Sequence, residues 1–342
     1  MGDDIMDKPK TINALMVHLR SKGLNISGSK QKQILKNIGY YHGYKGYRFV
    51  EKASNPINYS DFNEVKTIYD YDSQLKALFY PQIMFIETAL KNRVLDIVVN
   101  DVGSENFMTI FNSVLDDYKR LSLSGKKFNS SNARQEAQKK YDKAVNDRNK
   151  LRDSFLRTSS KAYNDQNSIA VHYQQKDQSI PIWGLFEMIS LGDFGYFVKT
   201  SNFRIRKKFS KEFGINTIYD TSAEMPHRII FALKDLRNAI AHNNIIFDTR
   251  FKTAEISGAV KTMLFNETSI KVEFKEIFDY LVLIIFVLKQ LGTTKTVMKK
   301  IVSDFKDITE FVRNQLPVSI YNMFTTTNLR RKISQLQNYI KH

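Results

Sequence analysis

The stretch LKDLRNAIAHNN, at residues 233–244, says more about the fold than any other part of the sequence. Apolar residues recur before and within it every three or four positions, which is the spacing of one helix face. They are Ile229, Ile230, Leu233 and Leu236. We therefore expect an amphipathic helix over about residues 222–243. Its C-terminal end carries Arg237, followed by Asn238 and, five positions after the arginine, His242.

The same periodicity extends over most of the chain and predicts an all-α fold. Further helices are expected over about residues 11–22, 29–38, 61–99, 271–291, 294–315 and 319–340. Within the third of these, Pro81 interrupts the pattern and is expected to kink or divide the helix. The apolar run YLVLIIFVL, at residues 280–288, is much shorter than the roughly 20 residues that cross a bilayer, so it predicts a buried helix.

Two shorter stretches are rich in aromatic residues. Residues 40–49, YYHGYKGYRF, alternate aromatic residues with glycine and basic residues, and we expect a turn with a short extended piece. Its tyrosines suit either packing against the helical core, which is favoured, or stacking on RNA bases. Pro181 and Trp183 stand at the start of another apolar helix, where we expect Trp183 in the core.

Positive charge dominates the chain, which has 342 residues, 52 Lys plus Arg against 35 Asp plus Glu, and a net charge of +17. Such a charge indicates a polyanionic partner, with nucleic acid ahead of an anionic membrane surface. More than half of the excess lies in residues 119–161, with 13 basic and 4 acidic residues. The size of this charge excess favours an RNA-binding insertion over a plain solvated face. A membrane-surface helix ranks third, because the apolar residues of the segment are too sparse for it.

Candidate RNA contacts are therefore basic or aromatic residues of the insertion, of a second basic cluster after residue 198, and of the aromatic stretch. They are Lys126, Lys127, Arg134, Lys139, Lys140, Arg204, Arg206, Lys207, Lys208, Tyr44 and Lys45.

Several classes of site are not expected. The chain has no cysteine and its six histidines are scattered, which argues against disulfides, zinc sites and a cysteine nucleophile. We expect neither a metal nor a cofactor. The first ten residues are polar and do not resemble a signal peptide, so a cytoplasmic protein without membrane spans is expected.

The helix end at residues 237–242 carries the first resemblance to known proteins. Arg237-Asn238-Ala239-Ile240-Ala241-His242 resembles the R-x-x-x-x-H signature of HEPN ribonucleases. Motifs elsewhere resemble the Abi family of abortive-infection proteins, of the AbiD/AbiF type, in that family's order from Lys8 to about Phe251. They are Lys8-Pro9, the helix ending at Gly23, Ile38-Gly39-Tyr40-Tyr41 with Gly46-Tyr47, Ile86 to Arg93, and Pro181-Ile182-Trp183 with Glu187 and Gly192.

This resemblance implies a HEPN-like helical bundle with a small N-terminal turn element and a helical C-terminal extension. The two parts of the bundle would be residues 61–118 and 164–260, and the basic insertion would be residues 119–163. Residues 1–60 and 261–342 would form the N-terminal and C-terminal regions. The chain departs from the family where Asn243, Asn244, Ile245, Ile246 and Phe247 follow His242, since the family has a further His or Arg and an aromatic residue there.

The resemblance further implies a metal-independent endoribonuclease of a toxin or anti-phage system. RNA carries its own nucleophile, the 2′-hydroxyl, so a base, an acid and a cation suffice, and the products are a 2′,3′-cyclic phosphate and a 5′-hydroxyl. His242 would move the proton and Arg237 would bind the phosphate oxygens. Asn238 would orient one of these groups, and Glu87 and Arg93 would support the site from the earlier helix.

Five positions along a helix leave two side chains about 140° apart around its axis, so Arg237 and His242 need not converge within one chain. HEPN proteins pair two such helices across a dimer, and we accordingly expect a homodimer.

Three alternatives to a nuclease stay open at this point. Arg237 and His242 can be a surface arginine and a helix-terminal histidine that stabilises the helix dipole. The chain can be a non-catalytic module that holds a regulatory RNA. It can also be a toxin that binds a host protein through its insertion, in which case its action would tolerate high salt.

Overall fold

The structure is a computed structural model that describes residues 10–116, 123–216, 218 and 220–342. Within these residues the chain forms fifteen α-helices and one π-helix, η1, and no β-strand beyond isolated bridges. The all-α fold predicted from the sequence is confirmed. Lys8-Pro9 and residues 119–122 of the basic insertion lie outside the described residues.

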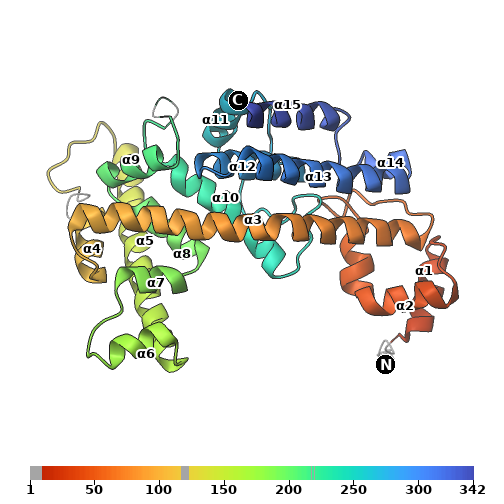
Figure 1. Ribbon diagram of the computed structural model, residues 1–342, viewed down its shortest axis with the longest axis horizontal. Helices are drawn as coiled ribbons and strands as arrows, with labels where there is room; N and C mark the ends of the chain where they lie inside the picture. The colour runs from red at the N-terminus through yellow and green to blue at the C-terminus, as the bar shows by residue number, and fades with distance from the viewer. Residues whose placement is uncertain (1–9, 117–122, 217, 219) are drawn as a thin grey trace.

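The helices follow the chain in the order of their labels (Figure 1). They are α1 (Ile12–Ser21), α2 (Gly28–Ile38), η1 (Gly39–Lys45), α3 (Phe62–Val102), α4 (Phe107–Val114), α5 (Ser131–Asn164), α6 (Ser168–Gln174), α7 (Ile182–Met188), α8 (Leu191–Thr200), α9 (Phe203–Glu212), α10 (Met225–Ala241), α11 (Gly258–Thr268), α12 (Ile277–Gln290), α13 (Lys295–Gln315), α14 (Val318–Tyr321) and α15 (Leu329–Lys341).

Helix α3 is 41 residues long and crosses the whole molecule in Figure 1. Asp61 and Glu64 form a capping box at its first turn, and Gly103, with φ +66°, ends it. The helix continues through Pro81, so the predicted division at this proline is wrong. Pro81 removes one helical hydrogen bond, but it is exposed, where water can bind the freed carbonyl, while Phe79 and Ile83 hold the opposite face in the core.

Helices from distant parts of the chain pack along α3 (Figure 1). Helix α10 packs between α3, α8 and α9, while α12 and α13 lie along another side of α3 and α15 covers them. Residues 277–288 of α12 are all buried, which confirms the buried helix predicted from this apolar run. One apolar core runs from Tyr47 to Ile340, and a smaller one joins α1 and α2 to the start of α3.

The aromatic stretch at residues 40–49 does not form the extended piece that its alternation predicted. Its first half is the π-helix η1, which continues α2 after Gly39, and only an isolated bridge joins Phe49 to Pro56. A Cβ at Gly43 would lie 2.3 Å from the side chain of Ile38, so only glycine allows this wide turn. Tyr47 is fully buried and Tyr41 is 75% exposed, so the stretch is packed in part.

Two other sequence predictions fail for identifiable reasons. Trp183 is 38% exposed and not in the core, because its indole N–H donates to Glu105, 3.0 Å away, at the surface. The helix expected over residues 319–340 is divided into α14 and α15, since the chain turns between residues 322 and 328.

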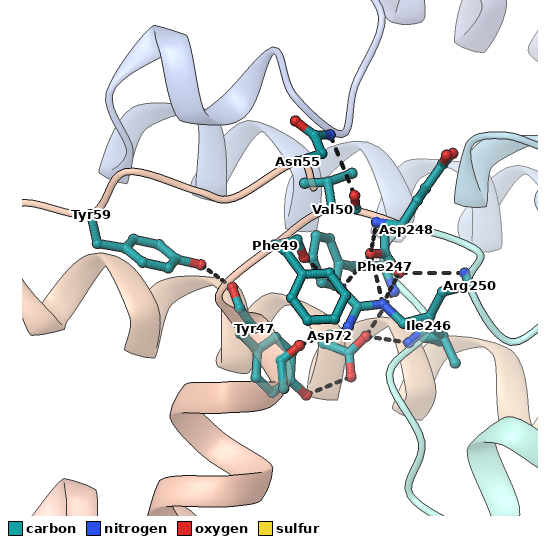
Figure 2. A network of polar contacts seen from close by, with 12 residues as sticks. Tyr47, Phe49, Val50, Asn55, Tyr59, Asp72, Ile246, Phe247, Asp248 and Arg250 are labelled. Carbon is teal, nitrogen blue, oxygen red and sulfur yellow. Dashed lines mark hydrogen bonds and ion pairs between the residues drawn. The ribbon is translucent and has the colours of Figure 1, made fainter. Parts of the chain in front are cut away.

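A buried carboxylate, that of Asp72 on α3, joins three parts of the chain (Figure 2). Its Oδ1 accepts hydrogen bonds from the backbone N–H groups of Ile246, at 2.7 Å, and Phe247, at 2.8 Å. Its Oδ2 accepts one from the Tyr47 hydroxyl, at 2.9 Å, and lies 2.8 Å from Nζ of Lys76. Burial and the nearby carboxylate raise the pKa of Tyr47, so its hydroxyl keeps the proton that it donates.

A second ionic contact reinforces the same junction. Arg250 binds the carboxylate of Asp248 and donates to the carbonyls of Gly46, at 2.8 Å, and Phe49, at 2.6 Å. Its guanidinium also lies 4.3 Å from the centre of the Phe49 ring. The N-terminal loop is therefore fixed to the segment that follows α10, as Figure 2 shows.

Replacing Asp72 tests this junction. Asp72→Ala should lower the free energy of unfolding by about 3–5 kcal/mol, because it leaves Lys76 without its countercharge and two buried N–H groups without an acceptor. The matched control is Asp70→Ala on the same helix, where the carboxylate pairs with Lys66 at the surface and its loss should cost less than about 1 kcal/mol. Urea unfolding followed by circular dichroism measures both. Equal losses in the two variants would contradict the role given to Asp72.

Candidate functional site

The candidate site is the C-terminal end of α10. The helix buries Ile229, Ile230, Leu233 and Leu236 as its periodicity predicted. It ends at His242, after which Asn243 adopts a left-handed conformation with φ +54°. The N–H groups of Asn243 and Asn244 donate to the carbonyls of Ile240 and Ala239, at 3.0 and 2.7 Å. These two bonds form a Schellman motif, which turns the chain sharply away from the helix and leaves His242 at its tip.

His242 is exposed. Within the described residues its imidazole takes part in no hydrogen bond or ion pair, while its backbone N–H donates to the carbonyl of Asn238, at 3.0 Å. The side chain is thus positioned by the helix end and is open to a ligand.

Arg237 lies on the side of α10 that faces α3. Its Nε is 3.3 Å from Oε2 of Glu87, and its Nη1 donates to Oδ1 of Asn238, at 3.2 Å. Glu87 in turn lies 3.0 Å from Nζ of Lys91, which donates to the carbonyl of Ile189, at 2.8 Å. Although Nε and Oε2 are close, neither atom makes a hydrogen bond, so the contact is electrostatic. The side chain of Arg237 is 27% exposed, so its guanidinium is held from one side and accessible from the other.

Arg237 and His242 do not contact each other, as the angle between their positions on the helix predicted. A pocket of about 470 Å³ beside the end of α10 is lined by Lys234, Asn238 and Asn243 among others, but by neither Arg237 nor His242. In a single chain the arginine and the histidine therefore present separate surfaces.

The structure also brings together residues that the sequence did not suggest for this site. Oδ1 of Asn243 accepts a hydrogen bond from Nζ of Lys76, at 2.9 Å, and its Nδ2 lies 3.4 Å from Nε2 of His42. These residues come from the loop after α10, from α3 and from η1. The one feature of the sequence that pointed to this cluster was Asn243 itself, which departs from the family pattern directly after His242.

Of the two supporting residues proposed from the sequence, only Glu87 lies at Arg237. Arg93 lies elsewhere: its Nη1 is 2.9 Å from Oε1 of Glu212, and its Nη2 donates to the carbonyl of Leu291, at 3.4 Å. It therefore joins α3 to α9 and to the end of α12.

The proposed RNA contacts occupy separate places. Lys126 and Lys127 lie in an exposed loop, Arg134, Lys139 and Lys140 on the exposed surface of α5, and Tyr44 and Lys45 in η1. The other four, Arg204, Arg206, Lys207 and Lys208, lie on α9.

Several of these basic groups already have partners. Nζ of Lys45 lies over the rings of Tyr40 and Tyr41. Arg204 and Lys208 bind Asp101, and their hydrogen bonds lower the pKa of that carboxyl to about 2. Arg204 and Lys208 consequently fix α9 to the end of α3 and are partly neutralised.

Within the described ranges, no group of three or more acidic or histidine side chains is arranged to hold a metal ion. Over the same ranges, none of the helices combines the length and the apolar character needed to cross a bilayer.

Comparison with known proteins gives the family. The chain matches the model of the family described as Abi-like protein over residues 33–248, which is more than half of its length. The chain belongs to the Abi-like protein family. The resemblance to the Abi family that the motifs predicted is thereby confirmed. In this Abi-like protein the matched part includes Glu87, Arg237 and His242 and leaves out α11 to α15. No curated protein and no solved structure was found to match the chain.

The contribution of the contact between Glu87 and Arg237 to the stability of the protein can be tested by substitution. Glu87→Gln should lower the free energy of unfolding by about 3 kcal/mol, because Lys91 and Arg237 would remain partly buried without a countercharge. Glu212→Gln removes the half-exposed carboxylate that pairs with Arg93 and should cost less than about 1 kcal/mol. Thermal unfolding at two salt concentrations would separate the two variants. A loss for Glu87→Gln no larger than that for Glu212→Gln would show that Glu87 does not anchor Arg237.

Proposed function

We propose that this Abi-like protein is a metal-independent endoribonuclease that acts in abortive infection, with Arg237 and His242 as its catalytic residues. The observation that carries the proposal is the pair itself: an imidazole open to solvent and a guanidinium held by Glu87, both at the end of one helix of an Abi-like chain. Arginine stays charged at any physiological pH, and histidine is the side chain best suited to exchanging protons near neutrality.

The chemistry follows from these two groups. His242 removes the proton of the ribose 2′-hydroxyl, whose oxygen attacks the adjacent phosphorus, and the bond from phosphorus to the 5′-oxygen breaks. The leaving oxygen takes a proton from an imidazolium, which leaves a 2′,3′-cyclic phosphate and a 5′-hydroxyl. Arg237 binds the non-bridging oxygens and stabilises the charge of the phosphorane. Asn238, hydrogen-bonded to Arg237, limits the rotation of the guanidinium.

The separation of Arg237 and His242 in one chain supports a dimeric enzyme. We propose that two copies meet with the ends of α10 facing each other, so that the arginine of one chain and the histidine of the other act on the same phosphate. Two histidines in one cleft would also supply the base and the acid separately.

Another function, RNA binding without cleavage, is favoured by one observation. Helix α5, away from the end of α10, carries nine basic residues against four acidic ones, and it would bind an RNA backbone whether or not Arg237 and His242 react with it. Such a protein would retain RNA but leave it intact.

Substitution of the two catalytic residues tests the proposal directly. His242→Ala and Arg237→Ala should each lower the rate of RNA cleavage at least about 100-fold, because general acid–base catalysis and electrostatic stabilisation contribute at least that much. Total cellular RNA is incubated with each protein in EDTA, and product ends are mapped. The controls are His172→Ala on α6 and Arg313→Ala on α13, which should cleave at the wild-type rate. Undiminished cleavage by either variant would show that the substituted residue is not catalytic. RNA that the wild type retains intact would favour RNA binding without cleavage.

The composite site makes a second prediction. When Arg237→Ala and His242→Ala chains are co-expressed with different tags and purified in tandem, the mixed dimer should cleave RNA well above either variant alone. Its cleft would contain one intact arginine and one intact histidine. Absence of activity in mixed dimers, with activity in wild-type dimers carrying the same tags, would show that the site does not combine residues of two chains.

A further inference from the structure

Three pockets lie end to end along α10. The first, of about 410 Å³, lies between α5, α8, α9 and the start of α10, and it shares Lys199 and His227 with the second, of about 390 Å³. The second shares Lys234, Asp235 and Thr253 with the pocket of about 470 Å³ at the end of α10. We call this row of pockets the α10 groove. From His227 to Asn238 it follows eleven residues, or about 16 Å of helix.

The first pocket of the groove is basic. Five cationic side chains line it, namely Lys140, Lys143, Arg148, Lys199 and Arg206. Three acidic groups, Asp116, Asp147 and Glu224, line it as well. One of them, Asp147, forms an ion pair with Lys199, with Nζ and Oδ2 2.6 Å apart. Lys140 and Lys143 are exposed and form no ion pair within the described residues. This end of the groove therefore attracts anions, and phosphates in particular.

His227 lies between the first and second pockets and contributes no charge. Its side chain belongs to a residue that is only 8% exposed, and burial, with Arg228 adding to it, lowers its pKa to about 3. Its Nδ1 is buried and has no hydrogen-bond partner. Because it is neutral and mostly buried, the imidazole adds an uncharged surface where the first two pockets meet.

The second pocket supplies an aromatic surface between cations. Tyr196 is 41% exposed and packs edge-on against Phe231, with ring centres 5.3 Å apart. Nζ of Lys199 lies 5.2 Å from the Tyr196 ring, and Nζ of Lys234 lies 5.6 Å from that of Phe231. A Cβ at Gly195 would lie 2.7 Å from the Phe231 ring, so the glycine allows α8 and α10 to approach closely enough for the rings of Tyr196 and Phe231 to meet. Aromatic rings flanked by lysines are typical of surfaces that stack unpaired bases.

The third pocket leads the groove to the catalytic turn. Asn238 and Asn243 line it, and His242 stands four residues after Asn238, on the same side of the helix. A strand that followed the groove from α5 would thus arrive beside His242.

We propose that the α10 groove binds single-stranded RNA. Phosphates lie against Lys140, Lys143 and Arg206, a base stacks on Tyr196 and Phe231, and the strand continues past Asn238 to His242. The last part of this path rests on the proposed nuclease function, but binding in the first two pockets does not. Duplex RNA is excluded from the aromatic surface because its bases are already stacked within the helix and its groove edges cannot reach the rings.

Binding is measured by fluorescence anisotropy in a His242→Ala background, with a labelled single strand of 12 nucleotides and a hairpin of the same base composition. Tyr196→Ala should weaken binding of the single strand about tenfold, the effect of losing one stacked base, while Tyr196→Phe should bind like the parent. Lys140→Glu/Lys143→Glu should weaken it further and lower the slope of log affinity against log salt by about two.

Two controls stand outside the groove: Tyr80→Ala, an aromatic residue of α3 that is 42% exposed, and Lys299→Glu/Lys300→Glu on α13. Both should bind within about twofold of the parent, since they remove the same chemical groups elsewhere. Unchanged affinity in the groove variants, or equal affinity for the hairpin, overturns the proposal. RNA cleavage by the wild type is scored separately. If the wild type does not cleave RNA but the groove variants lose affinity, the groove is supported and the proposed nuclease function is wrong. If the wild type cleaves RNA but the groove variants keep their affinity, the nuclease function is supported and the groove is wrong.

Discussion

The carboxylate of Asp72 is buried among four donors that come from three distant parts of the chain. A charge buried without such partners costs several kcal/mol, so the segment that leaves α10 must run where the N–H groups of Ile246 and Phe247 reach this oxygen. Only three residues separate His242 from Ile246, so the same contact fixes the direction in which α10 ends. The proposed catalytic histidine is exposed and unsupported by side chains, yet it stands on a rigidly placed turn.

Helix α3 holds α10 and the segment that follows it through two buried pairs of an acid and a lysine. Asp72 with Lys76, and Glu87 with Lys91, are buried acid–base pairs four residues apart on α3, and each acid also reaches the α10 region. Each lysine supplies a countercharge to its acid. The other oxygen of each carboxylate contacts the α10 region: Asp72 binds the N–H groups of Ile246 and Phe247, and Glu87 lies beside Arg237. Arg237 is held on the face toward α3, while the pockets of the groove open along other sides of the same helix. One helix, α10, thus carries both the proposed catalytic residues and the proposed path of the RNA to them.

Periodicity predicted most helices and placed Arg237 and His242 at a helix end, because these features depend on neighbours within a few residues. Its failures have non-local causes. The π-helix depends on the close fit of Gly43 against Ile38. The surface position of Trp183 depends on its hydrogen bond to Glu105. Helix α3 is continuous because Pro81 lies on its exposed side. The contact of Lys76 with Asn243 joins residues 167 apart, and nothing local announces it. The acid–base spacing at residues 72–76 and 87–91 was visible, but on a surface helix it is commonplace.

The sequence distance across the Asp72 contact bears on how the protein is made. Its nearer backbone partner, Ile246, follows 174 residues later, which a ribosome needs roughly 10 to 35 s to synthesise. During that interval the first half of the bundle exists without the segment that closes it. A chain broken off between His242 and Ile246 would contain the whole R-x-x-x-x-H motif but not the bonds that set its position. Incomplete copies of the proposed nuclease are therefore poorly equipped to harm the cell that is translating them.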